Sequence, residues 1–150
     1  GRALDDDHYR YKLEWLARLR TVLDGGSTPD DPIVVAGDYN IAPTDADVWD
    51  IGAFADSTHV SEPEREALAA LEDWGLHDTF RRVHPEDRLY TYWDYRAGMF
   101  HKHQGMRIDL LMATAPVADR VRFALVDRQA RKGKGPSDHA PVMIDIEEAQ

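Results

Sequence analysis

The sequence contains no cysteine and no long apolar run. Without cysteine, disulfide scaffolds, thiolate metal sites and cysteine nucleophiles are all excluded. No apolar stretch has the length needed to cross a bilayer, and the opening GRALDDDHYR has neither the basic start nor the apolar segment of a secretory leader. We therefore expect a soluble, cytoplasmic protein that makes no membrane contact.

Basic residues are also scarce. The chain has 18 Lys and Arg against 28 Asp and Glu, which gives a formal net charge of −10 and excludes a globally basic nucleic-acid surface. Hydrophobic residues at 43% and charged residues at 31% are typical of a chain that folds. A length of 150 residues, with no internal repeat and no long linker, predicts one domain with a sizeable core.

Apolar periodicity predicts two helices. From His8 to Leu23 apolar residues recur every three or four positions, and a Gly-Gly pair follows. A second helix should begin at Ser61, which forms a capping box with Glu64, and should end at Gly75.

The strands expected between these helices and after them give an α/β fold class. The run Ile33–Ala36 shows no polar alternation, which is typical of a strand covered on both faces. Turn residues bound further expected strands, which make about six with the first, at residues 76–80, 89–93, 107–113, 121–126 and 140–146.

Asp38 and Asn40 directly follow the first expected strand. Ligand sites of α/β folds gather where strands end, and an Asp and an Asn two residues apart can together hold a water molecule or a cation. The same two residues also favour an Asx-turn that merely closes the strand, because both side chains bond their own backbone. Both interpretations fit this segment.

Asp138 and His139 precede the last expected strand. A carboxylate beside an imidazole offers a metal ligand and a donor to phosphate, whereas a capped turn with an exposed histidine is the alternative. Asp109, within residues 107–113, would face inward if its two neighbours face the other layer. A buried carboxylate needs a donor, so we expect a hydrogen bond between Asp109 and His139, and a solvent-exposed strand-end Asp is the alternative.

Two further segments stand out by composition. The aromatic run YTYWDYR at residues 90–96 could stack on sugars and bases and hold phosphates, although such clusters more often belong to a core. The run RQARKGKG at residues 128–135 carries the densest positive charge and lies next to Asp138 and His139, an arrangement that attracts a phosphate group.

Taken in order, five segments resemble the C-terminal half of the exodeoxyribonuclease III family of AP endonucleases, within the endonuclease/exonuclease/phosphatase superfamily: GDYNIAPTDADV, WGLHDTFR, YTYWDYR, GMRIDLLMA and PSDHAPV. The resemblance runs from Tyr9 to Ile146. It implies half of a four-layer α/β sandwich, with one mostly antiparallel or mixed sheet and helices on its outer face. Asp-x-Asn and Ser-Asp-His are shared across the superfamily, whereas the NIAPTD and YWDYR stretches are similar to the DNA-repair branch.

The resemblance also implies roles for the candidate residues. Asp38 would orient and deprotonate the attacking water, and Asn40 would hold the scissile phosphate or that water. His139, oriented by Asp109, would stabilise the phosphate in its pentavalent state. Asp138, with Asp38 and Asn40, would bind Mg²⁺ or Mn²⁺, and hard oxygen ligands without thiolates independently favour Mg²⁺.

The substrate implied by the resemblance is double-stranded DNA with abasic sites or 3′ ends, cut by a 3′–5′ exonuclease and AP endonuclease. Three residues fall where the family lines the pocket for an abasic sugar, and the aromatic run and local basic residues add to them. The expected substrate contacts are Tyr92, Trp93, Arg96, Met106, Arg107 and Ile108.

Family members are longer and begin with another strand-rich half. We therefore expect residues 1–150 to be the C-terminal portion of such a domain, with the N-terminal half and its principal metal-ligating Glu absent. The chain would need that half to cut DNA. The alternatives are a catalytically inactive domain whose exposed sheet face serves binding, assembly or self-association, and another phosphoesterase of the superfamily, such as a phosphatase or sphingomyelinase.

Overall fold

A computed structural model describes residues 3–86 and 88–148 of the chain. Within these residues the helices are α1 (Asp7–Gly26), α2 (Glu62–Trp74), α3 (Thr79–Val83) and α4 (Ala115–Ala118), and the strands are β1 (Val34–Asp38), β2 (Leu76–Asp78), β3 (Asp109–Thr114), β4 (Val121–Val126) and β5 (Val142–Ile146). Short 3₁₀ turns at residues 45–47, 51–54, 96–98 and 128–131 occupy the connections.

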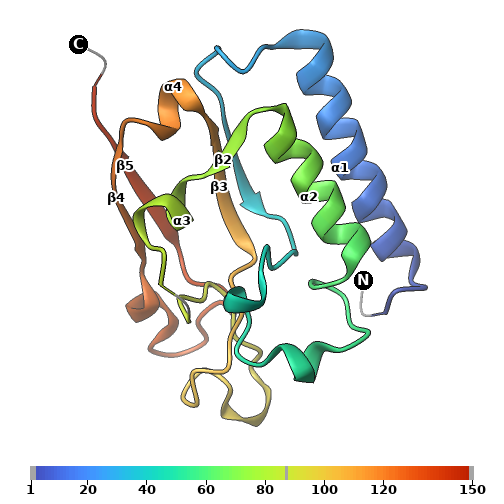
Figure 1. Cartoon of the computed structure of the whole chain (residues 1–150). Coiled ribbons are helices and arrows are strands. Elements are labelled where there is room, and N and C mark those ends of the chain that lie inside the picture. Colours follow the sequence, from blue (N-terminus) through green and yellow to red (C-terminus); the bar gives the residue numbers. More distant parts are fainter. Residues whose placement is uncertain (1–2, 87, 149–150) are drawn as a thin grey trace.

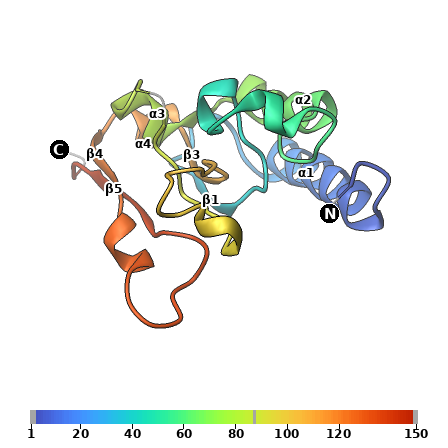
Figure 2. The ribbon, with the colours of Figure 1, turned by 90° about the horizontal axis from the view of Figure 1, so that it is seen from below.

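The strands form two antiparallel sheets. The first has the order β1-β3-β2, and the second pairs β4 with β5 (Figure 1). Strand β5 lies beside β3, so the two sheets adjoin. The long connection between β4 and β5 loops out from the body, away from α1 and α2 (Figure 2).

Helices α1 and α2 pack together against one face of the three-stranded sheet (Figure 1). The core between them is apolar, with Leu16 and Leu23 from α1, Leu71 from α2, and Leu110 and Met112 from β3. Because side chains alternate along a strand, burying Leu110 and Met112 under the helices directs Asp109 to the opposite face of the sheet.

Both predicted helices are confirmed, with their caps. The Asp6 side chain accepts a hydrogen bond from the backbone N of His8 at 2.9 Å and begins α1. Ser61 and Glu64 form the predicted capping box of α2, and Gly75 ends that helix at φ 125°, a conformation that glycine adopts readily.

The strand predictions are confirmed in part. Strand β4 has the predicted limits, but residues 89–93 form no strand, since Tyr92 makes only isolated bridges to Met106 and His139. Strand β2 ends at Asp78, because the Asp78 carboxylate accepts a hydrogen bond from the backbone N of Arg81 at 3.1 Å and begins α3. Five strands are thus present among the described residues, instead of about six.

Among the described residues, β1 is covered on one face only, although the sequence predicts a strand covered on both faces. Val34 is 42% exposed, and Ala36 and Asp38 are also exposed, because α1 and α2 both lie on the other face of the sheet. Phe123, Leu125 and Met143 of the β4-β5 sheet are exposed as well. Of the helices that the structure describes, none combines the length and apolar character needed to cross a membrane.

Candidate active site

Asp38 and Asp109 lie directly opposite each other. Asp38 is the last residue of β1, Asp109 is the first of β3, and the antiparallel register pairs the two. Like charges at directly opposed positions of a sheet are destabilising unless a positive group lies between them.

His139 lies next to both carboxylates. Its Nδ1 is 3.0 Å from Oδ1 and 2.9 Å from Oδ2 of Asp109, which confirms the predicted hydrogen bond. Its Nε2 lies 3.9 Å from Oδ2 of Asp38. Because an ionised carboxylate only accepts hydrogen bonds, Nδ1 carries a proton, and Nε2 faces Asp38.

The neighbours of these groups change their pKa values. The hydrogen bond that His139 donates to Asp109 raises the pKa of His139, against the opposite effect of partial burial. Burial raises the pKa of Asp38, and the negative charge of Asp109 adds to this, while the backbone N–H of Asn40 acts against it. The site therefore favours a protonated imidazole beside a carboxylate that holds a proton more readily than an exposed one.

Asp38 forms the Asx-turn that is one of the two alternatives for this segment, with Asn40 as the donor. Its backbone N donates to Oδ1 of Asp38 at 2.9 Å, and its Nδ2 donates to Oδ2 at 2.8 Å. The turn does not exclude a site, because it fixes the carboxylate of Asp38 on the face that His139 shares.

The group fits a divalent cation. One ligand atom each from Asp38, Asp109 and His139 lie within 4.8 Å of one another. The two carboxylates, without thiolates, are suitable ligands for a hard divalent ion, and the imidazole could bind a metal only in its neutral form, through Nε2. Asp138 is not a member of this group, and its backbone carbonyl accepts a hydrogen bond from the backbone N of Trp93 at 3.0 Å.

The three residues open into a hollow of about 540 Å³ on the face of the sheet away from α1 and α2. Ala36, Leu111, Ser137 and Pro141 are among its other lining residues. The site is therefore accessible to a large substrate.

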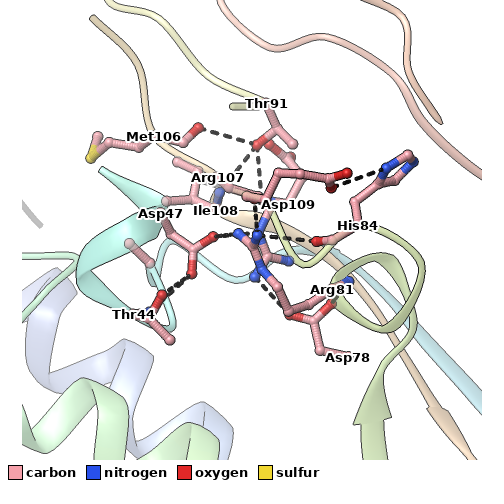
Figure 3. Close-up of polar contacts among 12 residues, drawn as sticks. Thr44, Asp47, Asp78, Arg81, His84, Thr91, Met106, Arg107, Ile108 and Asp109 are labelled. Carbon is pink, nitrogen blue, oxygen red and sulfur yellow. Dashed lines mark hydrogen bonds and ion pairs between the residues drawn. The ribbon is translucent and has the colours of Figure 1, made fainter. Parts of the chain in front are cut away.

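Arg107, expected to contact substrate, is instead 1% exposed. Figure 3 shows its guanidinium between two carboxylates: Nε donates to Oδ1 of Asp47 at 2.6 Å, and Nη2 lies 2.7 Å from Oδ2 of Asp78. Burial alone would raise the pKa of Asp47, but Arg107 and Arg81 hold it below its usual value. The guanidinium is committed to this buried cluster and is not available to DNA.

Thr91 is a residue that sequence reasoning missed. It is fully buried, and its Oγ1 accepts hydrogen bonds from the backbone N of Ile108 at 3.1 Å and of Asp109 at 3.2 Å (Figure 3). Thr91 thereby fixes the backbone that carries Asp109. A threonine within an aromatic run gives no sequence signal for such a role.

Three other expected substrate contacts are also buried. Trp93 packs with Tyr90, and Met106 packs with Ile108 in a second small cluster. Their apolar side chains are stabilised by burial in these clusters. Two of the expected substrate contacts remain accessible. Tyr92 is half-buried, and its ring lies 5.1 Å from that of His139. Arg96 is exposed and is paired with Asp94.

In the basic segment at residues 128–135, two arginines bond the backbone of other segments, whereas Lys132 is exposed. Arg128 donates from Nη2 to the backbone oxygen of Phe100 at 2.8 Å, and Arg131, 5% exposed, donates from Nη2 to that of Trp93 at 3.1 Å. Lys132 is exposed and lines a second hollow of about 560 Å³ beside these arginines. Lys132, exposed at the edge of this hollow, is placed to meet an anion.

Known proteins are similar to this chain in sequence. The sequence model of the Endonuclease/Exonuclease/phosphatase family matches residues 2–139. Exodeoxyribonuclease III of Haemophilus influenzae is 29% identical over 143 residues, which are 90% of this chain and 53% of that protein. Exodeoxyribonuclease of Bacillus subtilis is 29% identical over 138 residues, 91% of this chain and 52% of that protein. The chain thus spans about half the length of the curated relatives it matches.

Solved structures agree over almost the whole chain. An AP endonuclease from Archaeoglobus fulgidus superimposes with a TM-score of 0.93 at 33% identity, over 99% of this chain and 58% of that one. A 3′-5′ exonuclease from Neisseria meningitidis superimposes with a TM-score of 0.93 at 38% identity, with the same two coverages of 99% and 58%.

Proposed function

Because this chain belongs to the Endonuclease/Exonuclease/phosphatase family, we propose that its Asp38, Asp109 and His139 serve the metal-dependent hydrolysis of DNA phosphodiesters. The observation that carries this proposal is the pair of opposed carboxylates with an imidazole held by one of them, open to a large hollow. The relatives named above, which are exodeoxyribonucleases and an AP endonuclease, support a 3′–5′ exonuclease and AP endonuclease acting on abasic sites or 3′ ends. We also propose a cytoplasmic location, as expected from the sequence.

We further propose that the chain is the C-terminal portion of a longer domain. It spans about half of its curated relatives, and the sheet face that bears Asp38 is uncovered among the described residues. A preceding half would cover that face and complete the ligand set around the cation.

The carboxylates of Asp38 and Asp109 are hard oxygen ligands that favour Mg²⁺ or Mn²⁺, and we propose that these two residues hold the ion while the protonated His139 stays outside the ligand set. When bound, such an ion supplies positive charge that stabilises the charge developing on the phosphate. We propose Asn40, whose Nδ2 donates to Asp38, and Asp138, whose negative charge helps to raise the pKa of His139, for outer contacts to the ion.

The protein residues have separate tasks in an in-line attack by water. Asp38, whose pKa is raised, accepts the proton of the attacking water, and the Asn40 amide holds the carboxylate in place. His139, whose protonated form Asp109 favours, donates from Nε2 to a phosphate oxygen as negative charge builds up. Asp109 keeps the Nδ1 proton and the ring orientation.

A second candidate function is an inactive domain that serves assembly. The exposed Phe123, Leu125 and Met143 favour it, because uncovered apolar patches mark interaction surfaces. A third candidate is another phosphoesterase activity, since one 38% identical structure is described as a 3′ phosphatase bound to product DNA hairpin.

A substrate panel distinguishes these functions. The complete domain containing this chain is incubated with an abasic-site duplex, a duplex with a 3′ phosphate, an intact blunt duplex and sphingomyelin, with Mg²⁺ or with EDTA. We expect Mg²⁺-dependent cleavage of the abasic duplex and shortening from 3′ ends, lost in Asp109→Asn and kept in the surface control Asp119→Asn. Turnover of sphingomyelin alone, or of no substrate, would contradict the proposal.

A further inference from the structure

The backbone carbonyl of Asn40 is a point where two side chains from distant segments converge. Lys12 of α1 donates from Nζ to this oxygen at 3.0 Å, and His59 donates from Nδ1 at 2.8 Å. A carbonyl only accepts hydrogen bonds, so Nδ1 of His59 carries its proton. Asn40 has a φ of 53°, in the left-handed region that residues other than glycine seldom adopt.

Glu64 contacts both donor residues, Lys12 and His59. It is fully buried, its carboxylate forms an ion pair with Lys12, and its Oε1 accepts a hydrogen bond from the backbone N of His59 at 2.9 Å. Its Oε2 accepts from the backbone N and the Oγ of Ser61, at 3.0 and 2.6 Å. Every oxygen of this buried carboxylate is therefore used, as the burial of a charge requires.

The position of Asn40 sets the position of Asp38. Both the backbone N and Nδ2 of Asn40 donate to the Asp38 carboxylate. A movement of the Asn40 backbone out of its left-handed conformation would carry both donors away and release that carboxylate. The contacts of Lys12 and His59 thus act on Asp38 through one intermediate residue.

We propose that Lys12, His59 and Glu64 are positioning residues that lock the Asn40 backbone and thereby aim the Asp38 carboxylate at His139. None of the three contacts Asp38 by a hydrogen bond, and their role differs from that of a substrate or metal contact. The catalytic consequence rests on the proposed function, whereas the lock itself is a property of this chain alone.

The lock is tested by amide hydrogen exchange at Asn40 in the complete domain that contains this chain. His59→Ala removes the donor. His59→Asn keeps one, because an Asn side-chain nitrogen can take the place of Nδ1 and Asn tolerates the φ of 78° at this position. His103→Ala is the matched control, since His103 also has a positive φ, of 56°, and its ring bonds a backbone oxygen, that of Arg88, at 2.9 Å.

We expect His59→Ala to speed exchange at Asn40 by about tenfold or more while Met112 of β3 keeps its rate, because the opening is local. His59→Asn should restore the protection, and His103→Ala should leave Asn40 unchanged. An Asn40 rate that does not change in His59→Ala would overturn the proposal, as would an equal change in His59→Asn.

A second variant covers the possibility that His59→Ala unfolds the chain. Lys12→Met combined with Glu64→Gln removes both charges together, so no buried charge is left unpaired, and the amide oxygen of the introduced glutamine can still accept from the backbone N of His59. We expect this double variant to speed exchange at Asn40 and not at Met112. Unchanged exchange at Asn40 would contradict the role of Lys12.

The catalytic consequence is measured separately in the complete domain. His59→Ala should lower kcat on abasic duplex by about tenfold with KM within about threefold, since it misplaces a group that acts in the transition state, and His59→Asn should restore kcat. A rise in KM at constant kcat would overturn the positioning role. Failure of the unmodified domain to cut DNA would overturn the proposed function, while the exchange result would still decide the lock.

Discussion

Asp109 governs the protonation of His139 at the scale of single residues. The hydrogen bond between them favours the imidazolium and raises the pKa of His139. A group whose pKa is raised in the folded state stabilises the fold below its unfolded value, and this stability is lost as the pH rises through the folded value. The same protonated form is the one that can donate to a phosphate.

An NMR titration of His139 in the metal-free chain should give a midpoint above the ordinary value of 6.5. Asp109→Asn should lower that midpoint, because it removes the hydrogen bond and the charge that favour the protonated ring. Asp119→Asn, at an exposed pair with Arg82, should leave it in place. A midpoint that Asp109→Asn does not move would show that the two residues are not coupled.

The residues of the site could be predicted to different extents. The bond between Asp109 and His139 followed from the need of a half-buried carboxylate for a donor. The burial of Arg107 could not be foreseen, because its partner Asp47 lies 60 residues away in the chain and shows no strand or helix signal. Nor could the contacts of Thr91, whose hydroxyl replaces a missing strand partner for the backbone of residues 108 and 109.

At the scale of elements, the buried cluster around Arg107 joins the turn at residues 45–47 to the end of β2 and to the start of β3. Asp47 is fully buried, and Arg107 and Arg81 both pair with it. Removing one partner of a buried ion pair leaves the other charge uncompensated, which costs more than the pair itself contributes.

Arg107→Met should therefore lower the free energy of unfolding by about 3–5 kcal/mol, as measured by urea denaturation. Arg96→Met is the matched control, because Arg96 also pairs with an aspartate but its side chain is 87% exposed. The control should leave the denaturation midpoint unchanged. Equal effects of the two substitutions would contradict a structural role for the cluster.

The connection between β4 and β5 should contribute to DNA affinity through Lys132. Lys132→Ala should weaken binding and reduce the slope of log affinity against log salt by about one phosphate contact. Arg122→Ala removes the same charge near the opposite end of β4 and should leave the slope unchanged. The measurement is a fluorescence titration of labelled duplex at several salt concentrations, and equal slopes for Lys132→Ala and the unmodified protein would exclude the contact.

Local sequence signals predicted elements well where a cap or bounding turn residues were present. The capping box at Ser61 and the turn-bounded segment at residues 121–126 correspond to the observed α2 and β4. Residues 89–93 are apolar enough for a strand, but Tyr92 bridges two different segments and its neighbours bury their side chains in small clusters instead. Such competition between local pattern and tertiary packing is not visible in the sequence.

At the scale of the whole molecule, apolar residues lie on sheet faces that no described element covers. Leu125 and Met143 are cross-strand partners and are 40% and 46% exposed, and Phe123 lies on the same strand face at 52%. A sheet face of this kind is stabilised only by packing against another layer.

The 150-residue chain by itself should self-associate or be marginally folded, and we expect little nuclease activity from it. Leu125→Lys should shift the sedimentation profile toward monomer, because the lysine would place a charge in the apolar contact between two copies of the chain. Val22→Lys, at a position of α1 that is 68% exposed, is the control and should not change the profile. A monodisperse monomer that cuts abasic DNA would contradict this prediction.

The most direct test of the hydrolytic site is the single-turnover cleavage of an abasic-site duplex by Asp38→Asn in the complete domain, measured alongside the DNA dissociation constant. Asn keeps the shape of the side chain but removes the proton acceptor and its charge. We predict that the cleavage rate falls by about 10²-fold or more while the dissociation constant stays within about threefold, because the carboxylate acts mainly in the transition state. A cleavage rate that is unchanged, or that falls only in proportion to DNA affinity, would contradict a hydrolytic centre at Asp38, Asp109 and His139.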